Sequence, residues 1–202
     1  AFKYDAHANL DSVYSAYSEA LHSDEFAGKS VVNYISSHDD GGPFDRDRNY
    51  PKAAGPRLLL APGGAQIYYG DELARPLNVP GAQGDAHLRS FMNWESLDGE
   101  GKEIFDHWAR IGRFRRDHPA VGAGIHETLS ATPFVFTRVL ENESIKDKVL
   151  VALDVKGTIP IGGAYPDGTV LYDAYSDTEY TVTSGEIALD EPATVVLLSE
   201  VP

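Results

Sequence analysis

A histidine and two aspartates follow directly on an apolar stretch, in the run "VVNYISSHDDGGP". An imidazole beside carboxylates can bind hydroxyl groups, hold a metal ion or move protons, so His38, Asp39 and Asp40 are candidate site residues. The same run also suits an ordinary polar turn, because Asp, Gly and Pro are the commonest turn formers. The spacing alone therefore leaves both interpretations open.

The loop that follows alternates acidic and basic residues. Asp45, Asp47 and Asn49 are spaced as at the start of a calcium loop, but the glycine and the distal glutamate that complete such a motif are absent. Arg46 and Arg48 stand between them. We interpret this segment as a solvated loop and predict no metal site in it.

Two short apolar runs are the elements that would position these residues. "SVVNYIS", residues 30–36, is predicted to be a strand buried on both faces, and "AQIYYG", residues 65–70, a second strand entered through a glycine turn. The His-Asp cluster would then lie at the carboxyl end of the first strand. In α/β barrels this is the end of the strand that carries chemistry.

Helical periodicity surrounds both strands. Apolar residues recur at helical spacing over 9–26, the run 57–62 is the apolar end of a second helix, and 101–119 forms a third. Gly55 and Pro56 are expected to break or kink the second helix. The third helix is expected to turn four side chains to one face: Ile104, Phe105, Trp108 and Ile111.

The pattern changes to period two after residue 119, most clearly in "KVLVALDVKG", where Val149, Val151, Leu153 and Val155 would share one face. Further strand-like runs follow the same pattern: "PFVFTRVL", "TVLYDAYS", "YTVTSGEIAL" and "ATVVLLS". We therefore predict two domains, an α/β part over residues 1–119 and an antiparallel β-sandwich over residues 120–202.

Composition narrows the classes of partner. The formal net charge of −14 argues against nucleic acid and anionic membranes, and no apolar run reaches the length of a membrane span. The first ten residues lack the features of a signal peptide, and the absence of cysteine does not identify a compartment. A secreted or periplasmic location is favoured over a cytoplasmic one.

Two parallel strands are too few for a stable sheet. Parallel sheets are normally covered by helices and continued by neighbouring strands. We therefore expect that further strands, from another chain or a second copy, close the sheet, or that its edges are masked in some other way. Self-association or a partner should hide the uncovered apolar faces.

Several ordered motifs resemble the alpha-amylase family. "NYISSHDD" is similar to that family's motif at the end of the seventh barrel strand, and "LLLAPGGAQIYYGDELA" to its next helix end and eighth strand. "LRSFMNWES" resembles the loop that follows, although Asn-Trp-Glu replaces the commoner Gln-Trp-Asp, and "IGRFRRDHPAVGAG" resembles the last barrel helix. The resemblance implies the C-terminal units of a (β/α)8 TIM barrel followed by an antiparallel β-sandwich.

The same resemblance implies a retaining hydrolase or transferase acting on α-glucosidic bonds of starch-like glucans. Asp39 would stabilise the transition state and His38 would bind the same glucose. The remaining candidate substrate contacts are Asp40, Arg48, Tyr69 and Trp94. The nucleophile and the acid/base of the family come from the fourth and fifth strands, which are missing here, so the chain alone should be inactive.

Other interpretations stay open at this stage. The chain could be a non-catalytic glucan-binding or structural module, in which sandwich tyrosines bind starch, or half of a split enzyme. Core or interface positions are the better expectation for those tyrosines: Tyr165, Tyr172, Tyr175 and Tyr180. No cofactor is certain, and a calcium ion in the full-length enzyme would be held largely by missing segments.

Overall fold

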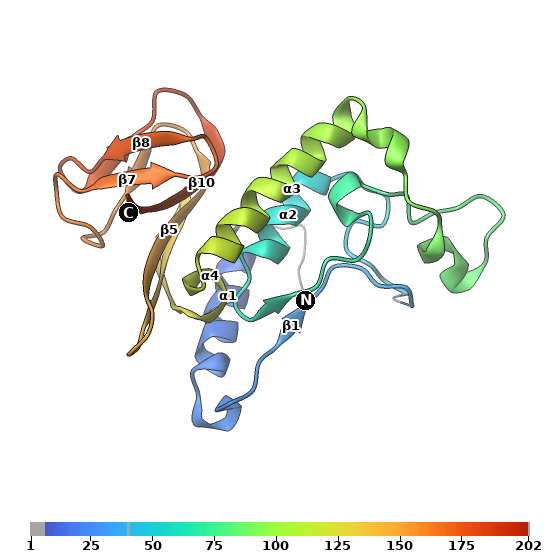
Figure 1. Cartoon of the computed structure of the whole chain (residues 1–202), viewed down its shortest axis with the longest axis horizontal. Helices are drawn as coiled ribbons and strands as arrows, with labels where there is room; N and C mark the ends of the chain where they lie inside the picture. Colours follow the sequence, from blue (N-terminus) through green and yellow to red (C-terminus); the bar gives the residue numbers. More distant parts are fainter. Residues whose placement is uncertain (1–6, 40, 202) are drawn as a thin grey trace.

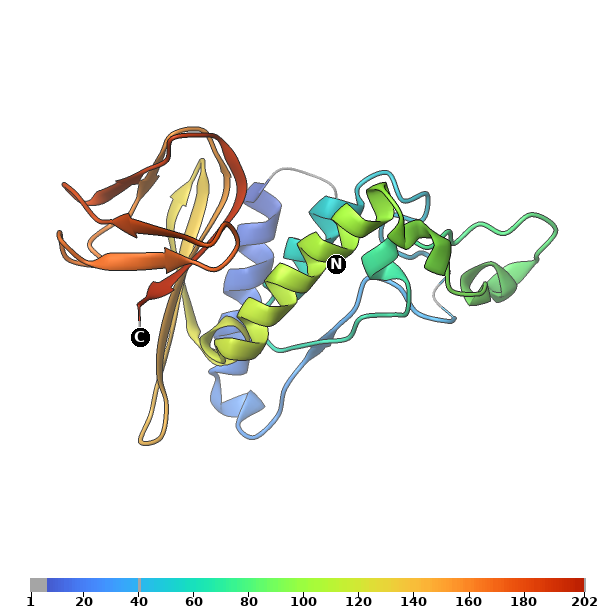
Figure 2. The ribbon, with the colours of Figure 1, turned by 45° about the horizontal axis from the view of Figure 1, so that its top comes forward.

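The computed structural model describes residues 7–39 and 41–201. Two parts lie side by side in Figure 1, a mainly helical part that carries a short parallel strand pair and an antiparallel β structure that contains the C-terminus. Figure 2 shows the same division from a second direction, with the helices between the β structure and a long loop. This arrangement is a partial barrel followed by a β-sandwich, as the sequence predicts.

The parallel pair is much shorter than the apolar runs indicated. Strand β1 (Val32–Asn33) pairs with β2 (Gly64–Ala65), and the amide of Gly64 donates to the carbonyl of Val31 at 2.7 Å. The prediction that the first strand is buried on both faces is wrong, because Val32 and Tyr34 are 64% and 49% exposed. No third strand pairs with this two-stranded sheet within the described ranges.

A glycine permits the close approach of the two strands. Gly63 has φ +89°, and a Cβ added to it would lie 2.8 Å from the carbonyl oxygen of Val31. Both the positive φ and the contact exclude a side chain at this position. Gly63 therefore allows β2 to begin against β1.

The described residues contain four α-helices and four short 3-10 helices. The α-helices are α1 (His7–Leu21), α2 (Pro51–Leu59), α3 (Glu100–Asp117) and α4 (Ala120–Ala123). The 3-10 helices are η1 (Asp24–Phe26), η2 (Asp71–Leu73), η3 (Gly84–Arg89) and η4 (Trp94–Leu97). None of the helices in the part of the chain described is both long and apolar enough to cross a membrane.

Helix α2 contains Gly55 and Pro56 without a break, which corrects the expectation from the sequence. Pro56 has no N–H to offer the carbonyl of Lys52 one turn earlier. That carbonyl is instead hydrogen-bonded to Nε2 of His107 on α3, at 2.7 Å. Gly55 lets the Trp108 ring approach closely, since an added Cβ would lie 3.2 Å from Nε1. Contacts from α3 therefore compensate for the two helix-breaking residues.

The buried face of α3 differs by one residue from the predicted face. Ile104, Trp108 and Ile111 are buried, but Phe105 is 40% exposed and Phe114 takes its place in the core. The Arg115 guanidinium also turns inward and donates to the carbonyls of Leu59 and Ala61, at 2.8 and 2.9 Å. It thereby caps the end of α2, where carbonyls lack helical partners.

The β structure consists of a six-stranded antiparallel sheet and a two-stranded one. The first has the order β3-β4-β5-β10-β7-β8, and the second pairs β6 with β9. Their bounds are β3 (Ile125–Ala131), β4 (Phe134–Glu141), β5 (Lys146–Val155), β6 (Thr158–Pro160), β7 (Val170–Asp173), β8 (Thr178–Thr181), β9 (Glu186–Ala188) and β10 (Ala193–Glu200).

The larger sheet has a hydrophobic core on each face. Val149, Val151 and Leu153 of β5 pack against the helices, whereas Leu150 and Ala152 face β6 and β9. Val155 joins the second cluster, although the alternation predicts it on the first face, because the backbone turns at Asp154 with φ 54°. The first core crosses residue 119 and includes side chains of α1, α2 and α3. The sandwich thus supplies one wall of the helical part.

Candidate functional site

His38 and Asp39 lie in an exposed turn shortly after β1. Nε2 of His38 is 3.7 Å from Oδ2 of Asp39, and the two side chains are 65% and 62% exposed. The Ser37 hydroxyl donates to Oδ1 of Asp39 at 3.0 Å. Asp40 lies outside the described residues. The pair can therefore present an imidazole and a carboxylate to a ligand from solvent.

A buried ion pair between Arg48 and Asp71 is hydrogen-bonded to Ser36, just before this turn. The Ser36 hydroxyl and the Arg48 guanidinium both donate to Oδ1 of Asp71, at 2.6 and 2.7 Å, and the Asp71 side chain is fully buried. Arg48 is 8% exposed and also donates to the carbonyl of Arg75 at 2.8 Å. Asp71 therefore links Ser36, after β1, to Arg48, and the predicted contact of Arg48 with substrate stays untested.

The segment after β2 is organised by Arg75, which is completely buried. Its guanidinium donates to the carbonyls of Tyr69 and Leu88, at 2.9 and 3.0 Å, and lies 4.0 Å from the centre of the Tyr69 ring. The Tyr69 hydroxyl donates to the carbonyl of Ser90 at 2.8 Å. These contacts fix Tyr69 within the loop and leave its ring 40% exposed.

One more hydrogen bond joins this loop to the His-Asp turn, because Nε of Arg89 donates to the carbonyl of His38 at 3.0 Å. Trp94 follows in η4 and is 66% exposed. Phe91 is 98% exposed, and the sequence analysis did not select it. The signal that could have identified Phe91 is an aromatic residue three positions before Trp94 in a polar loop. Figure 1 shows these loops on the side of the molecule away from the sandwich.

The alternating acidic loop has a structural role. The carboxylate of Asp45 accepts from the amides of Asn49 and Tyr50, at 2.7 and 2.8 Å, and Asp45 is 3% exposed. The expectation of a solvated loop is therefore wrong for this residue, which fixes the backbone of the two residues before α2. Among the residues with described positions, no group of three acidic or histidine side chains could hold a metal ion.

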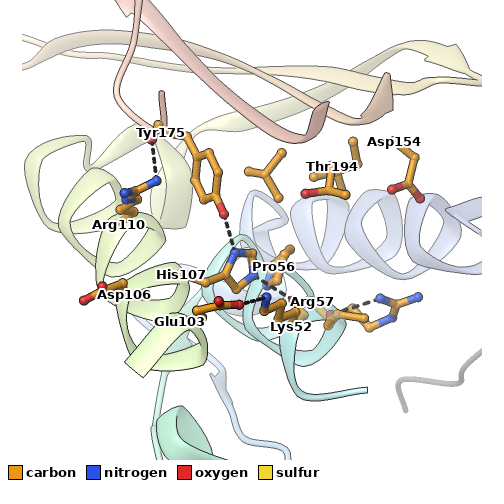
Figure 3. Close-up of a pocket in the computed structure, with 13 residues that line it drawn as sticks. Lys52, Pro56, Arg57, Glu103, Asp106, His107, Arg110, Asp154, Tyr175 and Thr194 are labelled. Carbon is orange, nitrogen blue, oxygen red and sulfur yellow. Dashed lines mark hydrogen bonds and ion pairs between the residues drawn. The ribbon is translucent and has the colours of Figure 1, made fainter. Parts of the chain in front are cut away.

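A separate cavity of about 840 Å³ lies between α2, α3 and the larger sheet (Figure 3). Lys52, Glu103 and Arg110 contribute from the helices, and Tyr175 and Thr194 from the sheet side. The cavity is lined by Lys52, Ala53, Pro56, Arg57, Glu103, Asp106, His107, Arg110, Leu153, Asp154, Tyr175, Thr194 and Val195. The candidate residues of the His-Asp turn and its loops are not among them, but Tyr175, a sandwich tyrosine named under the glucan-binding alternative, is.

Comparison with known proteins identifies relatives of both parts. The chain is 39% identical over 153 residues to a periplasmic alpha-amylase of Escherichia coli (strain K12), in a match that covers 73% of this chain and 20% of that protein. The chain thus spans about a fifth of this curated relative. No protein-family model matches the chain.

Solved structures share the fold. The alpha-amylase from Geobacillus thermoleovorans, complexed with acarbose, matches with a TM-score of 0.64 and 22% identity, over 96% of this chain and 43% of that one. An Anoxybacillus alpha-amylase matches with a TM-score of 0.61 and 17% identity, over 97% of this chain and 46% of that one. The 39% identity to the curated relative confirms the resemblance that the motifs indicated, and these structures show the shared fold: the chain corresponds to the C-terminal part of an alpha-amylase-family protein, with the last barrel units and the β-sandwich.

Proposed function

We propose that this chain supplies part of the active site of a retaining glycosidase that cleaves α-glucosidic bonds in starch-like glucans. Asp39 stabilises the positive charge that develops on the sugar in the transition state, and His38 donates a hydrogen bond to the same glucose unit. The observation that supports this most is the exposed His38–Asp39 pair at the end of β1, held by the buried Asp71–Arg48 ion pair.

The other candidate contacts follow from their exposure. Tyr69 and Trp94 reach solvent from the loop that is bonded to the carbonyl of His38, so they can contact sugar rings beyond the one that Asp39 binds. Asp40 follows Asp39 directly in the sequence and stays a candidate on that ground alone. Arg48 acts through Asp71, because its side chain is nearly buried and two of its nitrogens are already bonded.

Retention requires a nucleophile and an acid/base about 5 Å apart. We propose that both come from the missing barrel half, which also covers the exposed apolar side chains of the parallel pair. Val32, Tyr34 and Ile67 are 64%, 49% and 46% exposed. Any calcium ion of the full-length enzyme would be held by that half. A periplasmic location is proposed from the Escherichia coli relative.

A hydrolysis assay on a maltooligosaccharide tests this function in two steps. The purified chain alone should release no product, because binding and electrostatic assistance are all that it retains. In the completed protein, Asp39→Asn should lower kcat/KM by about 10²- to 10³-fold, whereas Asp190→Asn, at an exposed position in the sandwich, should leave it unchanged. Robust turnover by the chain alone, or equal activities of the two variants, would overturn the proposal.

The rival function is a non-catalytic glucan-binding or structural module. Affinity electrophoresis in starch gels separates the two, since the rival requires retardation of the chain that does not depend on Asp39. Of the sandwich tyrosines, Tyr165 is buried, with 2% exposure, and Tyr172 donates to Asp177. Tyr175 lines the cavity of Figure 3, which makes it the tyrosine to examine for binding.

A further inference from the structure

We infer that the cavity between α2, α3 and the sandwich is a second carbohydrate site, which takes a short, neutral α-glucan and is separate from the His38–Asp39 turn. The choice of an α-linked glucan rests on the proposed function. The existence of the site and its preference for a neutral polyhydroxyl ligand rest on the lining residues alone.

The size and the walls of the cavity suit a small ligand. Its volume of about 840 Å³ falls within the range of about 300–1,000 Å³ that is typical of ligand pockets. One wall is apolar and comes from both parts of the molecule, with Pro56 on α2 and Leu153 and Val195 on the sheet. The C–H faces of a sugar can pack on such a wall.

The charges around the cavity balance. Three cationic side chains, Lys52, Arg57 and Arg110, stand against three carboxylates, Glu103, Asp106 and Asp154. Lys52 is already paired with Glu103 at 2.9 Å. A balanced set of charges exerts no long-range preference for a charged ligand, but offers donors and acceptors to hydroxyl groups. A neutral ligand with many hydroxyls fits this lining better than a phosphate or an amine.

An ordered tyrosine stands at the sheet side. The Tyr175 hydroxyl is hydrogen-bonded to Nδ1 of His107 at 2.7 Å, and the Arg110 guanidinium lies 5.4 Å from the ring centre. Because Nε2 of His107 donates to the Lys52 carbonyl that Pro56 leaves free, Nδ1 must accept the tyrosine proton. Figure 3 shows this chain of contacts from the helix to the sheet. Tyr175 is therefore positioned before any ligand arrives, which lowers the entropy lost on binding.

Strand β5 departs from regular strand geometry where it lines the cavity. Asp154 has φ 54°, a left-handed conformation that is strained for a residue with a side chain. Such departures gather at ligand sites, where the surroundings maintain them. Asp154 and Thr194, from β5 and β10, lie side by side in Figure 3 on the same side as Tyr175.

Calorimetric titration of the purified chain with maltotriose tests the site. Thr194→Arg places a long side chain in the cavity from an exposed strand position and should lower the affinity at least about tenfold. Thr181→Arg is the matched control, since Thr181 is an exposed strand threonine that does not line the cavity. Arg110→Ala removes part of the cavity wall on α3 and should weaken binding, while the sheet residues stay unchanged. Circular dichroism melting shows which variants are folded.

Asp39→Asn separates this site from the proposed active site. Binding that survives Asp39→Asn and Thr181→Arg but is lost in Thr194→Arg and Arg110→Ala supports the inference, whatever the catalytic assay shows. Binding that is lost only with Asp39→Asn overturns it, because the sugar then occupies the exposed turn. Absence of binding to the unmodified chain also overturns it. Equal affinity for cellotriose, the β-linked analogue, overturns the assignment to an α-glucan.

Discussion

The sandwich buries its strands and pairs their edges far more completely than the parallel strand pair does. In the sandwich, the central strand β5 is hydrogen-bonded on both edges and packs against a hydrophobic core on each face. In the parallel pair, Val32 of β1 is 64% exposed, and Ile67, two residues after β2, is 46% exposed. Antiparallel strands are joined by local turns and can complete a sheet within one short segment, whereas parallel strands need neighbours from distant parts of the sequence.

The difference shows which contacts keep the helical part folded. Tyr14 of α1 is fully buried and donates to the carbonyls of Pro56 and Arg57, at 3.0 and 3.1 Å, and its ring packs edge-on against Phe136 of β4. The helices thus pack directly against the sandwich, and the two parts share one core. The junction between the two parts should therefore carry much of the stability, and the exposed strand pair little of it.

Truncating the junction should have the largest effect. Phe136 is 1% exposed and belongs to the core that both parts share, so Phe136→Ala should lower the free energy of unfolding by about 3–5 kcal/mol. Phe105→Ala removes the same ring from a site that is 40% exposed and should cost far less. Urea denaturation measures both. Similar losses of unfolding free energy in the two variants would show that the junction contributes no more to stability than an exposed position does.

The buried ion pair beneath the candidate turn comes next. Asp71→Asn keeps the shape of the side chain but leaves the nearly buried Arg48 without its counter-charge, which should cost about 3 kcal/mol. Hydrogen exchange should show earlier opening of residues 36–39, because Ser36 binds the same oxygen. Glu103→Gln is the control, since it breaks an exposed pair with Lys52 that is worth at most about 1 kcal/mol. If the exchange rates at residues 36–39 do not change, Asp71 does not stabilise the turn.

The elements of the sandwich were predictable because their signals are local. The apolar alternation of β4, β5 and β10 is complete within each strand, and the structure has all three where the sequence places them. The parallel strands were predicted too long because their length depends on neighbouring strands, which no pattern within residues 30–36 or 65–70 reveals. Local periodicity also could not place Phe105, since the packing of α3 on α2 decides which face is buried.

The candidate turn could be predicted from a local sequence signal, whereas the cavity could not. His38 and Asp39 are adjacent in sequence, so a motif could select them. The cavity joins Lys52, Tyr175 and Thr194 across more than a hundred residues, and only the packed fold brings them together. The buried ion pair of Arg48 with Asp71 joins residues 23 positions apart, and no local motif reveals it.

Acidification should weaken the junction. His126 on β3 has a side chain that is 1% exposed, and burial, together with the positive charge of Arg138, lowers its pKa from 6.5 to about 4. Between these values the unfolded chain binds a proton that the folded chain does not, so the free energy of unfolding falls as the pH drops through that range. The loss from pH 7 to pH 4.5 should be about 2–3 kcal/mol from this residue.

His107 should act in the same direction, since burial lowers its pKa too. Urea denaturation at several pH values measures the total effect, and His126→Gln should reduce the difference between pH 7 and pH 4.5 by the share that belongs to His126. A variant with the same pH dependence as the unmodified chain would contradict this assignment. The carboxylate of Asp11 lies 3.6 Å from Nε2 of His126 and favours the protonated form, so Asp11→Asn should enlarge the loss.

The exposed strand pair should give the smallest change in stability. Val32→Lys and Ile67→Lys replace side chains that already reach solvent, so each should change the free energy of unfolding by no more than about 0.5 kcal/mol. Association should respond instead, because a charge on an uncovered apolar face opposes its burial against another molecule. Native mass spectrometry of the two variants and of Val170→Lys, an exposed valine on β7, measures this effect. If the chain self-associates through the strand pair, only the first two variants should become monomeric. If all three behave alike, the copies meet elsewhere, and the strand pair is free for a missing barrel half.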